Sequence, residues 1–130
     1  MLFRSAQPTR VRLVQVEVED HTQDVVVRLT HRGRHGVGRG RSGSPADAAR
    51  ATVQALHALG AQVPFDVQAV ASPVGRTNKQ AVVVLLASEA DSARRYGVAQ
   101  ARTVEEAACR ATLHALNRWL TDASVFAAAV

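Results

Sequence analysis

The sequence has few aromatic residues, a single cysteine and no long apolar run. Only five of the 130 residues are Phe, Trp or Tyr, so Val, Leu and Ala must form most of the core. One cysteine, Cys109, excludes an internal disulfide framework and is typical of a reducing cytoplasm. No apolar segment reaches the ~20 residues that span a bilayer, and residues 1–4 do not resemble the start of a signal peptide. We therefore expect a cytoplasmic protein with no membrane partner.

Basic residues outnumber acidic ones by 16 to 11, which gives a formal net charge of +5. Such an excess is common in proteins that bind nucleic acids. However, Lys79 is the only lysine and all other basic residues are arginine. This bias indicates a GC-rich genome as much as selection for a polyanion, so charge alone does not decide the function.

The chain contains an internal repeat, because segment 36–59 returns as segment 97–119. Both copies run from a strand with small residues at alternate positions, through a turn, into a capped helix. The matching segments are ATVQAL (51–56) with ATLHAL (111–116), VVVRL (25–29) with VVVLL (82–86), and VQVEV (14–18) with VQAVA (67–71). Self-similarity of this kind indicates a duplicated structural unit.

Each copy is predicted to form three antiparallel strands followed by one helix. Val14, Val16 and Val18 alternate with polar residues, which predicts a half-buried strand over 11–19 with these valines on one face. The other predicted strands are 24–30, 35–41, 65–71, 80–87 and 94–102. The predicted helices begin after N-caps at Ser44 and Thr103, and their apolar stripes are Ala49, Val53 and Leu56 in the first and Cys109, Leu113, Leu116 and Leu120 in the second.

A three-stranded sheet with one helix leaves apolar surface exposed, so the two copies are expected to bury it against each other. The sequence therefore predicts an α+β fold of two β-β-β-α units with pseudo-two-fold symmetry, with antiparallel sheets packed on two helices. The predicted boundaries are a tail at 1–10, one domain at 11–120 made of repeats 11–60 and 65–120, and a tail at 121–130. Edge strands that have no pairing partner on one side favour a homodimer.

Three glycines at alternate positions of the third strand, Gly36, Gly38 and Gly40, require something that approaches the backbone closely. In the sequence alignment, Gly97, Ala99 and Ala101 take the same places in the second copy. Either the chain's own helix packs there, or a partner or ligand does.

The turn that follows is a candidate anion site, because free N–H groups and the helix dipole attract a carboxylate or phosphate. Ser42, Gly43 and Ser44 add hydrogen-bond donors, and Arg39 and Arg41 add positive charge. A purely structural turn is the alternative.

A basic hairpin precedes this turn and is a second candidate, for the phosphate backbone of RNA or DNA. Its arginines are Arg28, Arg32, Arg34, Arg39 and Arg41. No aromatic residue lies among them to stack on bases, and a solvated hairpin is the alternative.

No catalytic residue, metal ligand or cofactor motif is predicted. The acidic residues show no pairing for acid–base chemistry, and the histidines lack the spacing of a metal site. The GRSGS of segment 40–44 lacks the second glycine of a nucleophile elbow, and the turn lacks the lysine of a phosphate-binding loop. The sequence thus predicts a protein that is not an enzyme.

The duplicated β-β-β-α unit, the GxGxG of segment 36–40, the GSPADA of segment 43–48 and the ALN of segment 115–117 resemble the C-terminal regulatory domain of 2-isopropylmalate synthase. The resemblance covers roughly residues 11–120, without the catalytic barrel of that family. It implies a stand-alone dimeric domain that senses a small carboxylate or amino-acid effector, with a possible partner enzyme. The implied ligand-binding residues are Gly38, Gly40, Gly43, Ser44, Pro45 and Asp47, with Ala99 and Ala101 on the pseudo-symmetric side.

Segment 38–56 also resembles the strand-to-helix signature of double-stranded-RNA-binding domains. Where that family places paired lysines, this chain has Pro45 and Ala46, followed by Asp47. The expected function is a non-catalytic ligand-sensing or dimerisation module. The alternatives are an RNA- or DNA-binding module that uses hairpin 28–41, and a purely structural oligomerisation domain.

Overall fold

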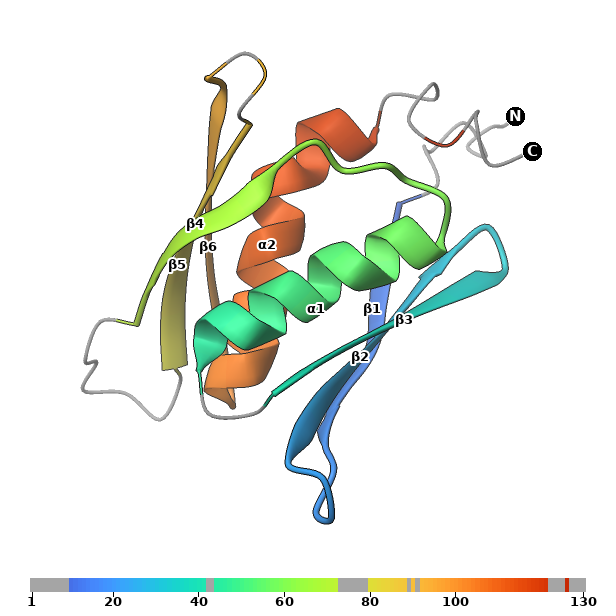
Figure 1. The fold of residues 1–130 in the computed structure, drawn as a ribbon, viewed down its shortest axis with the longest axis vertical. Coiled ribbons are helices and arrows are strands. Elements are labelled where there is room, and N and C mark those ends of the chain that lie inside the picture. Colours follow the sequence, from blue (N-terminus) through green and yellow to red (C-terminus); the bar gives the residue numbers. More distant parts are fainter. Residues whose placement is uncertain are drawn as a thin grey trace, which may run out of the picture.

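The computed structural model describes residues 10–41, 44–72, 80–88, 90, 92–121 and 126, which form two β-β-β-α units (Figure 1). The elements of the first unit are β1 (Arg12–Val18), β2 (Asp24–His31), β3 (Arg34–Arg41) and α1 (Pro45–Ala58). Those of the second unit are β4 (Asp66–Ala71), β5 (Gln80–Ala87), β6 (Arg94–Ala101) and α2 (Val104–Leu120). Within this described part of the chain, neither helix is both long and apolar enough to cross a membrane.

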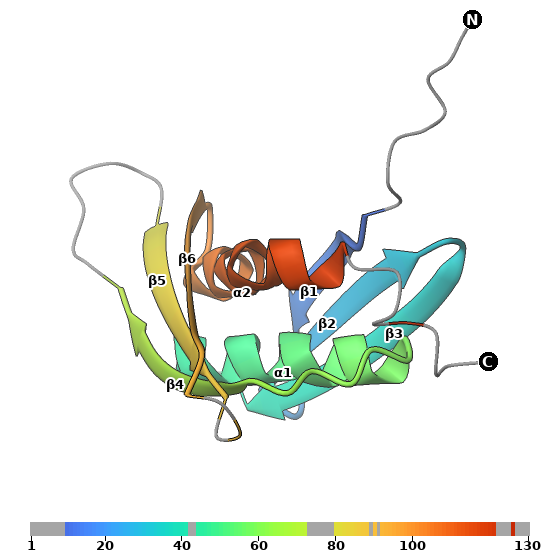
Figure 2. The same ribbon diagram turned by 90° about the horizontal axis from the view of Figure 1, so that it is seen from above.

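Each unit forms its own antiparallel sheet, in the order β1-β2-β3 or β4-β5-β6. The two helices pack against each other between the sheets, with α1 on β2 and β3 and α2 on β5 and β6 (Figure 2). In addition, α1 contacts β4 and α2 contacts β1, so each helix touches the first strand of the other unit. These reciprocal contacts confirm the predicted α+β fold of two pseudo-symmetric units that bury each other's apolar faces.

The predicted alternation of the first strand is wrong. A β-bulge shifts the register of β1 between Leu13 and Gln15, so the side chains before and after it no longer keep one alternation. Leu13 and Val16 pack against the core, whereas Val14 is 51% exposed and Val18 is 37% exposed. β4 has a bulge at the equivalent place, so the bulge belongs to the repeated unit.

The packing of each helix on its own sheet corrects the alignment of the repeats. A Cβ atom on Gly38 would lie 1.8 Å from the carbonyl oxygen of Ala51, and a Cβ atom on Gly97 would lie 1.8 Å from that of Ala111. Gly38 and Gly97 are therefore the same structural position, whereas the sequence match paired Gly97 with Gly36. The helix backbone passes closest to the strand at this point, where only glycine fits.

A pair of hydrogen bonds supports the corrected alignment. Gln54 Oε1 accepts a hydrogen bond from the backbone N–H of Arg39 at 2.6 Å, and His114 Nδ1 accepts one from the backbone N–H of Val98 at 3.1 Å. Gln54 and His114 occupy matching places in the helices. Each therefore satisfies an N–H group of an edge strand and holds the helix on its sheet. Matching residues of β3 and β6 are therefore two positions closer in the sequence than in the sequence match, so Gly40 corresponds to Ala99.

Small residues fill the space between the helices and the sheets. Thr52 and Thr112 are fully buried, and their hydroxyls donate to the carbonyl oxygens of Ala48 and Ala108 at 2.9 and 2.8 Å. Cys109 is fully buried, as its stripe predicts. The other buried helix residues are Ala48, Ala49, Ala51, Ala55, Leu56, Ala107, Ala108, Ala111, Ala115 and Leu116. Val53, Leu113 and Leu120, predicted to lie in the core stripes, are only partly buried because the alanine faces take the inner positions.

Aromatic side chains make contacts in both units. Phe65 and Trp119 meet edge to face with ring centroids 6.1 Å apart, and the guanidinium of Arg95 lies 5.5 Å from the centre of the Phe65 ring. His31 stacks on Phe126 with centroids 4.1 Å apart. Most of the two predicted tails falls outside the described residues.

Both helices begin at the predicted hydroxyl N-caps. Ser44 Oγ accepts a hydrogen bond from the N–H of Ala46, and Thr103 Oγ1 accepts one from the N–H of Glu106, each at 3.1 Å. These bonds satisfy N–H groups that have no partner within the helix.

Loss of either cap is expected to cost measurable stability. Ser44→Ala and Thr103→Ala should each lower the free energy of unfolding by about 1 kcal/mol, whereas Ser44→Gly should cost only a few tenths of that. Urea denaturation of the three variants measures the differences. A Ser44→Gly variant as unstable as Ser44→Ala would contradict the capping role.

Candidate functional site

The small residues predicted to face a ligand face the helices instead. A Cβ atom on Gly40 would lie 2.8 Å from the carbonyl oxygen of Asp47, and Gly38 lies against Ala51. Ala101, on the same inward face of β6, is only 7% exposed. The chain's own helix is thus what these small residues admit, and it fills the space in which an effector was expected.

The turn before α1 has its contacts within the chain. Ser44 is occupied as N-cap, Pro45 is the first helical residue, and Asp47 forms an ion pair with Arg50 at 3.5 Å. Gly43 lies outside the described residues. The described contacts therefore fit a structural helix start.

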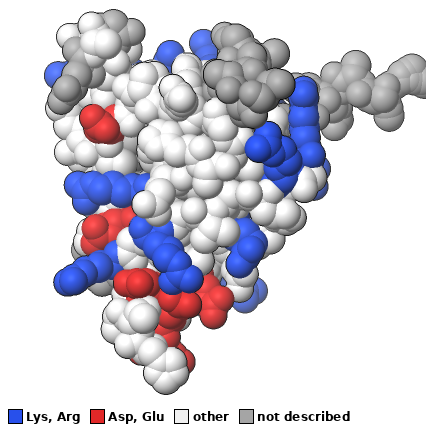
Figure 3. Space-filling model, turned by 45° about the vertical axis from the view of Figure 1, so that its right-hand side comes forward, with Lys and Arg blue, Asp and Glu red and all other residues white. Residues whose placement is uncertain are grey.

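The arginines of hairpin 28–41 do not share one surface. Arg28, Arg39 and Arg41 project from the outer face of the first sheet, whereas Arg32 lies in the β2–β3 turn and lines a groove on another side. Arg39 forms an ion pair with Glu19 at 2.7 Å, and this hydrogen bond to Arg39 lowers the pKa of Glu19. Figure 3 shows acidic side chains beside the basic ones in its lower half. The hairpin is therefore a mixed surface.

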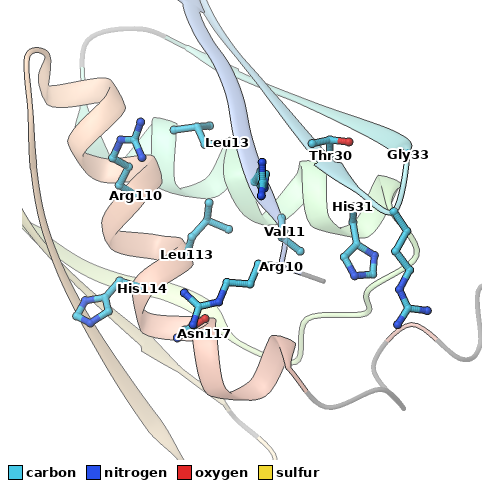
Figure 4. Close-up of a pocket in the computed structure, with 12 residues that line it drawn as sticks. Arg10, Val11, Leu13, Thr30, His31, Gly33, Arg110, Leu113, His114 and Asn117 are labelled. Atoms are coloured by element: carbon cyan, nitrogen blue, oxygen red, sulfur yellow. The ribbon is translucent and has the colours of Figure 1, made fainter. Parts of the chain in front are cut away.

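A groove of about 1120 Å³ lies between β1, the β2–β3 turn and α2 (Figure 4). Its apolar side chains are Val11 and Leu13 from the start of the first strand and Leu113 from the middle of α2. Its polar lining consists of Arg10, Arg12, Thr30, His31, Arg32, Arg110, His114 and Asn117. The groove thus combines an apolar part with a basic rim.

The two units differ just before their first strands. The bulges of β1 and β4 align Leu13 with Val67, so Val11 takes the place of Phe65, which is buried at 4% exposure and packs on Trp119. Segment 61–65 closes the second unit with Ala61 and Phe65 in the core. Val11 is smaller than Phe65 and lines the groove.

The charges at the groove have one sign, since no Asp or Glu lines it among the residues that the structure describes. Arg110 is held by Glu106 at 2.8 Å along α2, so its charge is partly balanced. No ion pair holds Arg10, Arg12 or Arg32 within the described ranges. Guanidinium groups bind carboxylates and phosphates through paired hydrogen bonds. The groove therefore suits an anion that also carries an apolar part.

No protein-family model and no curated protein matches this chain. The resemblance to the regulatory domain of 2-isopropylmalate synthase therefore stays a hypothesis based on short motifs.

Chemistry other than binding has little support in the described residues. Burial raises the pKa of the Cys109 thiol to about 11, so at neutral pH it is a protonated core residue and not a nucleophile. His114 Nδ1 accepts a backbone N–H, which leaves the proton of the neutral ring on Nε2. No cluster of three or more His, Cys, Asp or Glu side chains forms a metal site within the described ranges.

Sequence reasoning missed most residues of the groove. The sequence predicts a role for Arg32, but in binding the phosphate backbone of RNA or DNA along hairpin 28–41. Arg10, Arg12, Leu113 and Asn117 come from the two ends of the chain, and only the contact of β1 with α2 brings them together. One sequence signal near the groove is that the second unit has Phe65 where the first has Val11. This difference shows only when the bulges of β1 and β4 are used to align the two units.

Proposed function

We propose that this chain is a non-catalytic ligand-sensing module and that the groove between β1 and α2 binds a small anion with an apolar part. The observation that carries the proposal is the lining itself, in which arginines surround Val11, Leu13 and Leu113 with no acidic side chain among the described residues. This is the ligand class, a small carboxylate or amino acid, that the resemblance implies. The proposal moves the site away from the glycines of β3.

The recognition follows from the two parts of the lining. Arg10 and Arg32 supply charge-assisted hydrogen bonds to a carboxylate or phosphate group. Leu13 and Leu113 cover an aliphatic chain of a few carbons, and each buried methylene contributes ~0.8 kcal/mol. An anion without an apolar part, or an apolar molecule without charge, should therefore bind much more weakly.

A thermal-shift experiment tests the proposal. Hexanoate and hexyl phosphate are compared with hexanamide and inorganic phosphate, each titrated against the full chain. A ligand at ten times its Kd stabilises the folded state by ~1.4 kcal/mol, which raises the melting temperature by several degrees. We expect that shift for hexanoate, hexyl phosphate or both, and little shift for the two controls.

A pair of charge reversals locates the site. Arg10→Glu should abolish the shift, because the Arg10 side chain extends across the groove toward Asn117 of α2 (Figure 4). Arg28→Glu makes the same change in charge on the outer face of the first sheet and should leave the shift intact. Equal loss in both variants would indicate a nonspecific charge effect, and no shift with any anion of the panel would refute the proposal.

Binding of RNA or DNA remains the alternative function. It predicts a salt-dependent gel shift that is lost when Arg32, Arg34 and Arg39 are all changed to alanine. The separation of these arginines on different faces, and the pairing of Arg39 with Glu19, make it the weaker proposal. If neither anions nor nucleic acids bind, the purely structural oligomerisation domain is left.

A further inference from the structure

The outer faces of the two sheets differ although the strands are equivalent. The outward residues of the first sheet are polar or charged except Val26 and Val37; strand by strand they are Arg12, Gln15, Glu17, then Thr30, Arg28, Val26, Asp24, then His35, Val37, Arg39 and Arg41. The equivalent positions on the second sheet are Asp66, Ala69, Ala71, then Ala87, Leu85, Val83, Ala81, then Arg94, Tyr96, Val98 and Gln100. A sheet face that points away from its own helix and is largely apolar is typical of an interaction surface.

The apolar side chains of this second face are ordered by size. In one cross-strand row Tyr96 pairs with Leu85, which pairs with Ala69; in the next row Val98, Val83 and Ala71 follow in the same order. Tyr96 is 61% exposed and Val98 is 53% exposed. Each row therefore falls from a large side chain on β6 to alanine on β4.

We propose that this face binds a second copy of the chain, with the two-fold axis parallel to β5. Such an axis lays β6 of one copy over β4 of the other, as in aligned sheet packing. Tyr96 then fits over Ala69 of the second copy and Val98 over Ala71, so large side chains meet small ones. An axis perpendicular to the strands would instead place β6 on β6, with large side chains against each other.

The charges at the end of the face fit the same axis. Asp66, Ala87 and Arg94 form the row beside Leu85, with the acid on β4 and the base on β6. Neither Asp66 nor Arg94 has an ion-pair partner among the described residues. The proposed axis brings Arg94 of each copy over Asp66 of the other, which makes two symmetric ion pairs at the rim.

The size of the face indicates a reversible dimer. Eleven outward residues are fewer than the roughly 20 to 30 on each side of a standard interface, so we expect dissociation on dilution. The described residues nearest the two ends of the chain lie on the first unit. Arg10 lines the groove, and Phe126 stacks on His31. The proposal does not depend on ligand binding in the groove.

Sedimentation equilibrium over a concentration series tests the interface. The full chain should show a monomer–dimer equilibrium, and Tyr96→Asp should weaken dimerisation roughly 30-fold or more. Val37 is the equivalent residue of the first sheet, so Val37→Asp is the matched control and should leave the dimer unchanged. Circular dichroism verifies that each variant is folded. A chain that stays monomeric, or a dimer insensitive to Tyr96→Asp, would overturn the proposal.

Charge exchange tests the axis with variants that leave the apolar face intact. Arg94→Asp and Asp66→Arg place like charges opposite each other in their own homodimers, and each should dimerise roughly tenfold more weakly. An equimolar mixture of the two variants restores both ion pairs in the heterodimer, so it should regain the affinity of the unmodified chain. A mixture that dimerises no better than either variant would overturn the proposed axis.

Discussion

Replacing Gly38 with alanine is expected to unfold the protein or to lower its free energy of unfolding by about 4 kcal/mol or more. The new methyl carbon would lie 1.8 Å from the carbonyl oxygen of Ala51 and 2.8 Å from the backbone nitrogen of Ala55. Both atoms belong to the helix backbone, so no side-chain rotation relieves the clash. The helix must move away from β3, which opens the core. Urea denaturation of the purified variant measures the loss.

Two matched variants show whether this close approach is the cause. Gly97→Ala places a methyl group 1.8 Å from the carbonyl oxygen of Ala111, so it should be as damaging as Gly38→Ala. Gly40→Ala should be milder, because the nearest atom is 2.8 Å away and the second unit has Ala99 at this position. If Gly38→Ala were no worse than Gly40→Ala, the corrected alignment of the repeats would be wrong.

Removal of a buried leucine from the first unit should also destabilise the second. Leu56→Ala is expected to cost about 2–5 kcal/mol, the range for deletion of a fully buried leucine side chain. Both helices contribute to one buried cluster between the sheets, so the two units are expected to unfold together. Trp119 is the only tryptophan of the chain and lies in the second unit, so its fluorescence reports on that unit alone.

The comparison is made with Leu116→Ala, the equivalent change in the unit that holds Trp119. Fluorescence and far-ultraviolet circular dichroism should give the same midpoint in each variant, shifted by similar amounts. A Leu56→Ala variant in which the Trp119 transition stays at the midpoint of the unmodified chain would show that the units fold independently.

The site could be predicted from the sequence only in part. The glycines at alternate positions of β3 did indicate a close approach to the backbone. Of the two alternatives, packing of the chain's own helix is the one that agrees with the structure. The ligand site expected there has no room, because the same small residues that would admit a ligand admit α1. The groove instead needs Arg10 and Leu113 on facing elements, and residues about a hundred positions apart leave no local pattern.

The two β-β-β-α units, the helix starts at Ser44 and Thr103, and the need of each unit for the other could be read from the amino-acid order alone. These features follow from local chemistry, namely side-chain alternation, capping and the apolar surface that a lone unit exposes. The bulge in β1, the equivalence of Gly38 with Gly97, and the groove could not, and they emerge only in the folded chain. Each of these depends on where a helix backbone passes a strand, and that distance is set by the packing of the whole core.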